Sequence, residues 1–452
     1  MDIKTYISEN RERFMEELFG LLRIPSISSE ADHKPDMYRA AEYWKQILLK
    51  AGADKAEVFE TEGNPVTYGE KIIDGALPTV LVYAHMDVMP VDPLELWTSN
   101  PFEPEIRDGK IWARGADDDK GQGFMHAVAF EYLVKTGQLA CNVKFMIEGE
   151  EEVGSPNLKK WCEDHKAMLK ADVILVSDTS MIAPDIPSIT VGLRGVIHAE
   201  IEAIGCDKEL HSGLFGGVVA NPLNELCKLI AGMSDENGRV MIPGFYDDVR
   251  ILPEEERCVL AQIPLNEEQY KQTIGARELI GETGLSIVER IGTRPSFDVT
   301  GILGGYTGLG PKAVIPTKAI AKISMRIVPN QDYEKIGLLL KKYVNDNTPA
   351  SMIFKVSIDN SGTYYLFSTN TFAYKAAEKA YQMTYNKQPI PMYSGGSIPI
   401  VTEFEKVLGI KSILMGFGLS SDMIHSPNEN FPIENFYKGI ETIVLFYKYF
   451  TE

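Results

Sequence analysis

The first fifty residues carry apolar side chains at intervals typical of two amphipathic helices. Between residues 3 and 23 the apolar positions recur with helical spacing, and Pro25 then ends the helix because its ring cannot continue it. A second helix is predicted over about 36–51, with Gly52 as its C-terminal stop.

Short apolar runs rich in β-branched residues then predict buried strands at 77–88, 142–150 and 171–178. Helical spacing between these runs predicts helices at 124–133 and 156–169. Strands that alternate with helices imply an α/β fold, in which a mostly parallel sheet carries helices on both faces.

After the third buried strand the pattern changes to an alternation of apolar and polar residues. Segments 187–205, 315–329 and 350–359 follow this alternation, which is typical of antiparallel strands with one solvated face. Helices are predicted between them at about 221–233 and 332–346. This middle part is therefore predicted to be an inserted α+β domain with an antiparallel sheet.

The α/β pattern returns at about residue 366 and continues to a last helix that ends at Phe450. We therefore predict a discontinuous catalytic domain made of residues 1–187 and 366–452, interrupted by an inserted domain over 188–365. Two domains also agree with a length of 452 residues, which exceeds what one hydrophobic core usually supports.

Composition narrows the possible partners and the compartment. The chain carries 45 Lys and Arg against 64 Asp and Glu, a net charge of -19 that repels nucleic-acid phosphates and anionic lipids. Neither nucleic acid nor a membrane is expected as a partner, and the polar N-terminus does not resemble a signal peptide. Five scattered cysteines without a CxxC pair favour a reduced, cytoplasmic compartment.

Clusters of acidic residues and histidine follow the predicted strands, where open α/β sheets place their sites. His85 and Asp87 end the first strand, three aspartates stand at 117–119, and four glutamates lie between 148 and 152. Each cluster alone has a simpler explanation: a hydrogen-bonded histidine, a helix cap or a solvated charge run. Packed carboxylates, however, repel one another unless cations neutralise them.

Two further positions extend this set, because Asp178 closes the third strand and His425 follows a glycine-rich loop near the C-terminus. A mixture of imidazole and carboxylate ligands suits zinc, manganese or cobalt and disfavours calcium. The residues therefore indicate a transition-metal site, although spacing alone does not assign a role to each of them.

The motifs together resemble a known family. The order His-x-Asp-Val, Arg-Gly-x-x-Asp-Asp-Lys-Gly, Glu-Glu-x-Gly-Ser, Ser-Asp and a C-terminal His is similar to the co-catalytic metallopeptidases that include aminoacylases and carnosine-type dipeptidases. The dipeptidase branch matches best, through the segments at 211–217 and 395–399. The resemblance implies a hydrolase that uses two divalent ions, zinc first, with manganese or cobalt as alternatives.

The resemblance also implies a ligand set. Asp118 would bridge the two metal ions, His85 and Asp178 would hold one of them, and Glu152 and His425 would hold the other. Two ions about 3.5–4 Å apart would acidify a shared water and polarise the scissile carbonyl. The family also tends to have a cis peptide bond after the bridging aspartate.

Catalytic roles follow from the same resemblance. Glu151 would be the general base, and Asp87 would orient His85 or modulate the metal. His211, carried in from the inserted domain, would stabilise the oxyanion in the active site of a partner subunit. The inserted domain is therefore expected to act as a lid and dimerisation domain, and a homodimer is expected.

Recognition of the substrate carboxylate is the last expectation from the resemblance. Arg326 would pair with the carboxylate, and Gly395, Gly396 and Ser397 would offer further donors to it. One departure stands out, because related dipeptidases carry Arg two residues before the Gly-Gly pair and this chain has Tyr393.

Three functions stay open from the sequence. The first is metal-dependent hydrolysis of a dipeptide, and the second is removal of an acyl or succinyl group from an N-acyl amino acid. The third is a binding protein of the same fold that has lost catalysis, although every expected ligand position here holds Asp, Glu or His. A serine hydrolase is not favoured, because the chain has no Gly-x-Ser-x-Gly motif.

Overall fold

The computed structural model describes residues 1–452, except for the side chain of Asn360. The chain forms two compact units, each with its own internal contacts. They are unit 1, Met1–Val191 with Phe367–Met392 and Ile400–Glu452, and unit 2, Gly192–Leu366 with Tyr393–Pro399.

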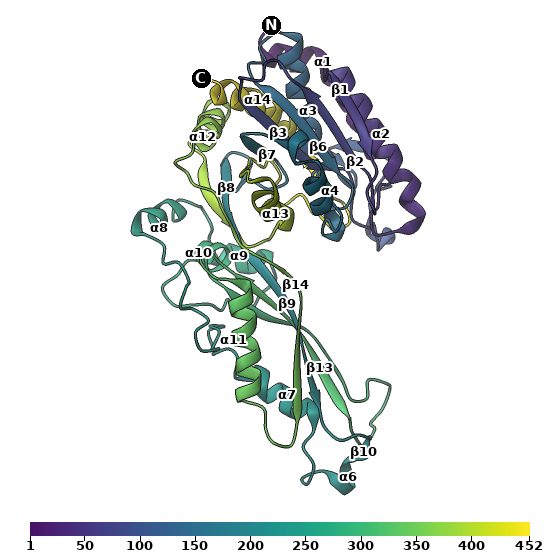
Figure 1. Ribbon diagram of the computed structural model, residues 1–452, viewed down its shortest axis with the longest axis vertical. Helices are drawn as coiled ribbons and strands as arrows, with labels where there is room; N and C mark the ends of the chain where they lie inside the picture. Colours follow the sequence, from purple (N-terminus) through teal and green to yellow (C-terminus); the bar gives the residue numbers. More distant parts are fainter. The chain divides into compact units, whose positions relative to one another are not determined.

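Unit 1 contains a mixed sheet in the order β1-β2-β6-β3-β7-β17-β8, with β16 paired to β8 (Figure 1). Its strands are β1 (Lys55–Phe59), β2 (Val66–Lys71), β3 (Thr79–His85), β6 (Asn142–Glu148), β7 (Val173–Val176), β8 (Ser188–Leu193), β16 (Ile390–Ser394) and β17 (Ser412–Leu414). A small separate sheet joins β4 (Glu105–Arg107), β5 (Lys110–Trp112) and β18 (Asn430–Pro432).

The central strands β6, β3, β7 and β17 run parallel, as the alternation of strands and helices predicts. In register, His85 pairs with Glu148 and Tyr83 pairs with Val176, so the carboxyl ends of β3, β6 and β7 meet at one edge. This edge is where the acidic clusters begin. The antiparallel strands β1, β2 and β8 on either side were not expected from the apolar runs alone.

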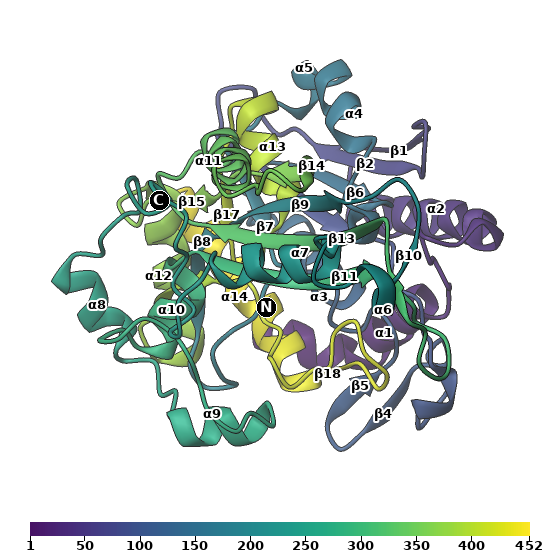
Figure 2. The same cartoon turned by 90° about the horizontal axis from the view of Figure 1, so that it is seen from below.

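Helices cover both faces of this sheet (Figure 2). Successive strand residues point to opposite faces, so Tyr83 and Ala84 mark the two sides. The Tyr83 ring packs against Phe404 of α13 (Pro399–Leu408) at 5.1 Å between centroids. On the other side α3 (Lys120–Lys135) approaches so closely that a Cβ at Gly123 would lie 2.9 Å from the Cβ of Ala84.

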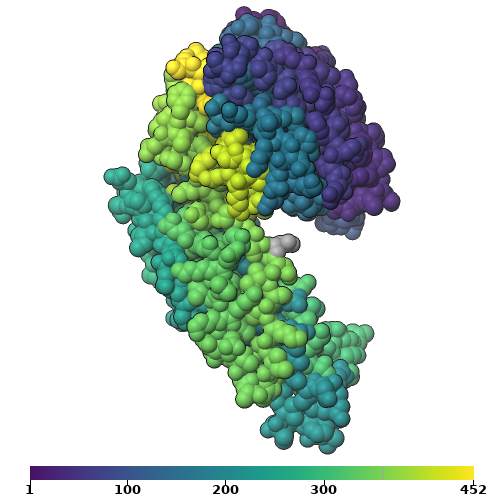
Figure 3. All heavy atoms as spheres, in the orientation of Figure 1, coloured from purple at the N-terminus to yellow at the C-terminus, as the bar shows by residue number. Residues whose placement is uncertain are grey.

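The N-terminal helix of unit 1 packs against the C-terminal one, so the purple and yellow ends of the chain share its surface (Figure 3). The α-helices of unit 1 are α1 (Ile3–Leu22), α2 (Lys34–Ala51), α3 (Lys120–Lys135), α4 (Leu158–Asp164), α5 (Lys166–Leu169), α12 (Phe372–Tyr385), α13 (Pro399–Leu408) and α14 (Ile433–Phe450). Short 3-10 helices are η1 (Ala31–His33), η2 (Leu94–Leu96) and η3 (Glu151–Val153).

Unit 2 is built on a four-stranded antiparallel sheet in the order β11-β13-β9-β14, packed against α7 and α11. Unit 2 as a whole contains the strands β9 (Gly195–Ile204), β10 (Leu210–His211), β11 (Ser296–Gly304), β12 (Val314–Ile315), β13 (Lys318–Ile327), β14 (Ile353–Gly362) and β15 (Tyr365–Leu366). Its helices are α6 (Ser212–Phe215), α7 (Pro222–Ala231), α8 (Glu254–Leu260), α9 (Glu267–Thr273), α10 (Ile287–Thr293) and α11 (Tyr333–Asp346).

The prediction of one alternating strand over 187–205 was wrong. The segment forms two strands that belong to different sheets, and Arg194 stands between them. All of β8 is buried, whereas β9 alternates between buried and partly exposed positions after its first three residues. The alternation that predicted a solvated face is therefore a property of β9 alone.

Candidate metal centre

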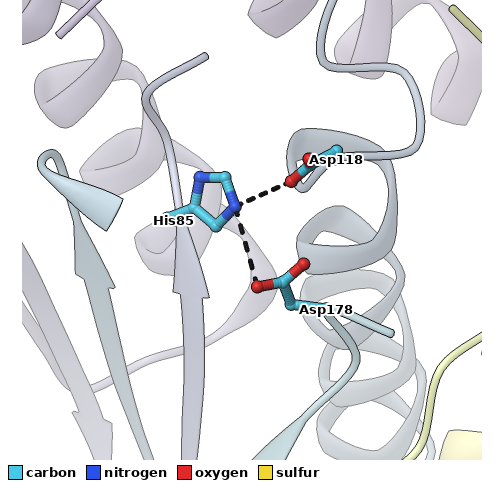
Figure 4. A group of neighbouring side chains, drawn as sticks. All are labelled: His85, Asp118 and Asp178. Carbon is cyan, nitrogen blue, oxygen red and sulfur yellow. Dashed lines mark hydrogen bonds and ion pairs between the residues drawn. The ribbon is translucent and has the colours of Figure 1, made fainter. Parts of the chain in front are cut away.

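The first candidate metal site lies at the carboxyl edge of the parallel strands, around His85 (Figure 4). This side chain is fully buried at the last position of β3. Its Nε2 lies 2.9 Å from Asp118 Oδ1 and 3.9 Å from Asp178 Oδ2. Asp178 follows the neighbouring parallel strand β7, so the register of the sheet brings the two side chains together.

A second candidate site shares Asp118 with the first. The Nε2 atom of His425 lies 2.9 Å from Asp118 Oδ2 and 3.1 Å from Glu152 Oε2. In each group the potential ligand atoms lie within 4.8 Å of one another. Asp118 therefore offers one oxygen to each group, which is the geometry that a bridging carboxylate requires.

The charges of this cluster fit a pair of cations. Burial and neighbouring carboxylates raise the pKa of Asp178 to about 6, and burial first raises the pKa of Glu152 to about 7. Hydrogen bonds with Asp118 and Glu152 raise the pKa of His425 to about 10. Without metal, protons thus supply the positive charge that the carboxylates need, and two divalent ions would replace them.

His85 shows the same balance inside the protein. Burial acts to lower its pKa, but hydrogen bonds with Asp118 and Asp87 raise the pKa well above its usual value. A neutral imidazole and ionised carboxylates are the forms that bind zinc, manganese or cobalt. The donor set therefore fits transition-metal ions of this kind.

Asp87 connects the two ligand groups through the main chain. Its Oδ1 and Oδ2 accept hydrogen bonds from the N–H groups of Glu151 at 3.2 Å and Glu152 at 3.1 Å. Its Oδ1 also lies 3.5 Å from Nδ1 of His85. One buried carboxylate thus fixes the position of an imidazole and of the loop that carries two glutamates.

Glu151 begins η3 beside the ligand groups, and the residue as a whole is half-buried. Burial is the main reason that the pKa of Glu151 lies well above its usual value, and the charges of Asp178 and Asp118 add to the effect. A carboxylate with a raised pKa is a stronger base than an ordinary glutamate.

The loop that carries Asp118 is held by a residue to which the sequence had assigned no role. The buried carboxylate of Glu429 accepts hydrogen bonds from the main-chain N–H groups of Gly115, Asp117 and Asp118, and from the side chain of Arg114 at 2.8 Å. The peptide after Asp118 is cis, as expected. A glutamate four residues after His425 in the same C-terminal motif was the available signal.

Two of the residues expected to bind the substrate carboxylate, Arg326 and Ser397, contact each other directly in unit 2. Arg326, on β13, donates from Nη1 to Ser397 Oγ at 2.8 Å. Gly395 instead accepts a hydrogen bond from Nε of Arg194 at 2.9 Å, an arginine that the sequence reasoning missed. The signal for it was a charged residue between two apolar strands.

His211 lies elsewhere in unit 2, at the end of β10 and directly before α6. Its side chain is exposed, and its Nδ1 accepts a hydrogen bond from Gly213 N at 3.1 Å. The ring thus caps the N-terminus of this short helix.

The model of peptidase family M20/M25/M40 matches residues 81–449, which is most of the chain. The chain belongs to this family. The family resemblance inferred from the motifs and the prediction of a metal-dependent peptidase are thereby confirmed.

Relatives of this M20 peptidase include named dipeptidases. Cys-Gly metallodipeptidase dug1 of Schizosaccharomyces pombe is 31% identical over 96% of this chain and 95% of its own length. The human Beta-Ala-His dipeptidase is also 31% identical, over 98% of this chain and 91% of its own length.

Solved structures of the family share the fold. The M20 metallo-carboxypeptidase Sso-CP2 of Sulfolobus solfataricus is 34% identical, with a TM-score of 0.86 over 97% of this chain and 99% of its own. The dipeptidase Dug1p of Saccharomyces cerevisiae is 27% identical, with a TM-score of 0.83 over 99% of this chain and 98% of its own. The predicted α/β fold with a separate antiparallel sheet is confirmed.

Proposed function

We propose that this M20 peptidase hydrolyses dipeptides with a free C-terminal carboxylate. The observation that carries the proposal is the carboxylate of Asp118, whose two oxygens each contact the histidine of a separate ligand group. Relatives named as dipeptidases at 31% identity over nearly the whole chain favour this substrate class.

The proposed ligands are His85 and Asp178 for one ion, Glu152 and His425 for the other, and Asp118 between them. Zinc is the proposed metal, with manganese or cobalt as alternatives, because the donors mix imidazole and carboxylate. When bound, the ions supply Lewis acidity that acidifies the attacking water and polarises the scissile carbonyl.

Glu151 is the proposed general base. It takes the proton of the attacking water and returns it to the leaving amine, and its raised pKa suits both steps. Asp87 keeps Glu151 and His85 in place through the hydrogen bond and close contact described above. Glu151 carries the proton and Asp87 positions Glu151, so neither residue has gained or lost a proton at the end of a full cycle.

The carboxylate of the substrate is proposed to bind Arg326, with Ser397 and the Gly395-Gly396 backbone beside it. Tyr393, where related dipeptidases carry Arg, donates its hydroxyl proton to Glu256 at 2.8 Å and accepts from Arg250 at 3.3 Å. It therefore supplies no charge to the substrate. Recognition of the carboxylate rests on the arginines that remain, and a longer peptide is the corresponding alternative substrate.

We also propose a homodimer in which His211 serves the active site of a partner subunit. Apolar side chains near His211 in sequence support this, because Leu214 and Val218 are 74% and 85% exposed. The inserted domain, predicted over residues 188–365, would then act as lid and dimerisation domain. A cytoplasmic location is proposed as well, since all five cysteines are free thiols. No helix among the described residues combines the length and apolarity needed to cross a membrane.

The test is hydrolysis of a mixed panel by metal-stripped protein, before and after addition of Zn²⁺ or Mn²⁺. The panel contains Ala-Ala and β-Ala-His, a tripeptide, and N-acetyl and N-succinyl amino acids. Metal-dependent cleavage confined to dipeptides supports the proposal. Cleavage of the N-acyl compounds instead would move the substrate to the deacylase class, and cleavage of the tripeptide from its C-terminus would indicate a carboxypeptidase. No cleavage with either metal would favour the non-catalytic alternative.

A further inference from the structure

Arg194 holds the loop of the proposed carboxylate site in three places. Its side chain donates from Nε to Gly395 O at 2.9 Å, and its main-chain N donates to Gly396 O at 3.1 Å. Its main-chain O accepts the hydroxyl proton of Ser397 at 2.5 Å. One residue at the junction of β8 and β9 thus binds three consecutive residues about two hundred positions away.

The hydrogen bonds of Ser397 define its role more closely than the sequence did. Its single hydroxyl proton goes to the carbonyl of Arg194, and its oxygen accepts from Nη1 of Arg326 at 2.8 Å. A hydroxyl has one proton to donate, so this Ser397 orients Arg326 and offers no proton to a substrate. The main-chain carbonyl of Arg194 therefore reaches Arg326 through this shared serine, while the Arg194 side chain acts on the loop through Gly395.

The charged groups around the loop sum to a net positive charge that one anion can balance. Burial, and then the nearby charge of Arg326, lower the pKa of Arg194 to about 10, which leaves this guanidinium group charged at neutral pH. Arg326 is charged as well, because a guanidinium group is not deprotonated in proteins. Asp298 is the acidic neighbour that acts on both arginines. Two positive charges facing one negative charge leave a net charge of about +1, which matches a single carboxylate.

Glycine at position 395 is part of the same arrangement. A Cβ there would lie 3.0 Å from Nη2 of Arg194 and 2.7 Å from a methyl carbon of Ile291. The guanidinium therefore packs against the loop backbone where any side chain would displace it. This contact is independent of the hydrogen bonds and leads to the same assignment.

We propose that Arg194 is a positioning residue for substrate-carboxylate recognition, acting through the Gly395–Ser397 loop and Arg326. The proposal rests on the proposed function, because it takes the ligand to be the C-terminal carboxylate of a peptide. Arg194 aligns Arg326, and the two guanidinium groups together set the preference for a free acid over an uncharged terminus.

The experiment measures binding in the Glu151→Gln protein loaded with Zn²⁺, so that turnover does not interfere. Titration calorimetry gives the affinity for Ala-Ala and for its C-terminal amide, with Arg194 intact and as Arg194→Lys. Lysine keeps the charge but cannot form the same side-chain contacts with the loop. The affinity for the acid is expected to fall about tenfold and the affinity for the amide about twofold or less.

Two further variants make the result specific. Gly395→Ala moves the Arg194 guanidinium without removing it, and should reduce the acid-to-amide preference in the same direction. In the double variant Arg194→Lys with Arg326→Lys, the fold-loss of affinity for the acid should be smaller than the product of the two single fold-losses, because both residues act on one carboxylate. Arg239→Lys, whose ion pair is with Glu282, serves as the control for general loosening of unit 2.

Each outcome is decisive. An unchanged acid-to-amide preference in Arg194→Lys would overturn the positioning role and leave the proposed function intact. An equal loss for acid and amide would show that Arg194 only stabilises unit 2, which also overturns the proposal. Equal affinity for acid and amide in the Glu151→Gln protein with Arg194 intact would show that no site recognises the carboxylate, and this would overturn the proposal as well. Failure of the proposed function appears separately, as no dipeptide turnover when Glu151 is intact.

Discussion

Asp118 shows how one side chain determines the chemistry of the whole centre. Its two oxygens lie 2.9 Å from His85 and 2.9 Å from His425, so neither ligand group is complete without it. The hydrogen bonds of Glu429 to the main chain around Asp118 fix where those oxygens point. At the scale of single residues, the position of the Asp118 backbone would therefore control where the two proposed metal ions bind.

Removal of this shared ligand should affect both ions. Asp118→Asn replaces one carboxylate oxygen by an amide nitrogen that cannot bridge, so the tightly bound metal should fall from about two ions to one or fewer per chain. The measurement is metal content after gel filtration. Asp178→Asn is the matched control, since it belongs to one group alone and should retain the His425 ion. Two ions bound tightly to Asp118→Asn would contradict the bridging role.

Removal of the proposed base should separate chemistry from metal binding. Glu151→Gln leaves all proposed ligands in place, so we expect a loss of kcat of at least about a hundredfold with metal content unchanged. Steady-state hydrolysis of Ala-Ala and metal analysis on the same sample measure the two effects. Retention of most of the turnover would show that another group accepts the proton.

Metal affinity should depend on pH, because metal ions and protons compete for the same atoms. The pKa of His425 is about 10, that of Glu152 about 7 and that of Asp178 about 6 in the metal-free protein. Lowering the pH through these values protonates the ligands, so the affinity should fall below about pH 10 by up to about tenfold per unit for each proton displaced, and more steeply below about pH 7.

The test of this prediction is calorimetry at pH 7 in two buffers of different ionisation enthalpy. Metal binding should release at least about one proton, which appears as a heat that depends on the buffer. The same heat in both buffers would mean that the ligands are already deprotonated, against the direction of the cited pKa values.

At the scale of elements, the parallel strands β3, β6 and β7 could be predicted because each is a short apolar run with a histidine or acidic side chain at or just after its carboxyl end. His85 ends β3 and Asp178 follows β7, and their approach depends only on parallel pairing. The break between β8 and β9 was not predicted, because only Arg194 separates the two strands and the segment reads as one continuous extended stretch. Arg194 binds the Gly395–Ser397 loop through partners about two hundred positions away, and no local pattern records such contacts.

The contact between α3 and β3 is close enough to predict the effect of a substitution. Gly123→Val would place a branched side chain where a single Cβ already lies 2.9 Å from Ala84, so unfolding free energy should fall by about 2 kcal/mol or more. Urea unfolding measures the change. Gly75→Val is the control, since nothing lies within 4 Å of a Cβ there. Equal stability of both variants would show that the helix can shift away from the sheet.

For the whole molecule, the order of the motifs was the strongest signal in the sequence. The proposed metal ligands come from five separate places between His85 and His425, and each place alone had a simpler explanation. The whole pattern identified the family, whereas the anchoring of the Asp118 loop by Glu429 became visible only in the folded chain. The net charge of -19 made nucleic-acid and membrane partners unexpected, and it gave no indication of the fold.

The proposed exchange of His211 between subunits makes a prediction for mixed proteins. Glu151→Gln and His211→Ala should each be nearly inactive alone. After dissociation and reassociation in equal amounts, about a quarter of the wild-type activity should return, because half of the dimers would be hybrids with one intact site. Hydrolysis of Ala-Ala before and after mixing is the measurement. No recovery from variants that demonstrably exchange subunits would contradict the exchange of His211.

The hydrogen bonds of Glu429 to the Asp118 loop have a consequence for biosynthesis. The loop leaves the ribosome some three hundred residues before the carboxylate that holds it, and His425 is equally late. A nascent chain therefore carries the acidic groups of an incomplete centre through most of its translation. The proposed metal centre can be completed only once synthesis has passed Glu429, so a chain that stops before His425 should lack the proposed hydrolytic activity.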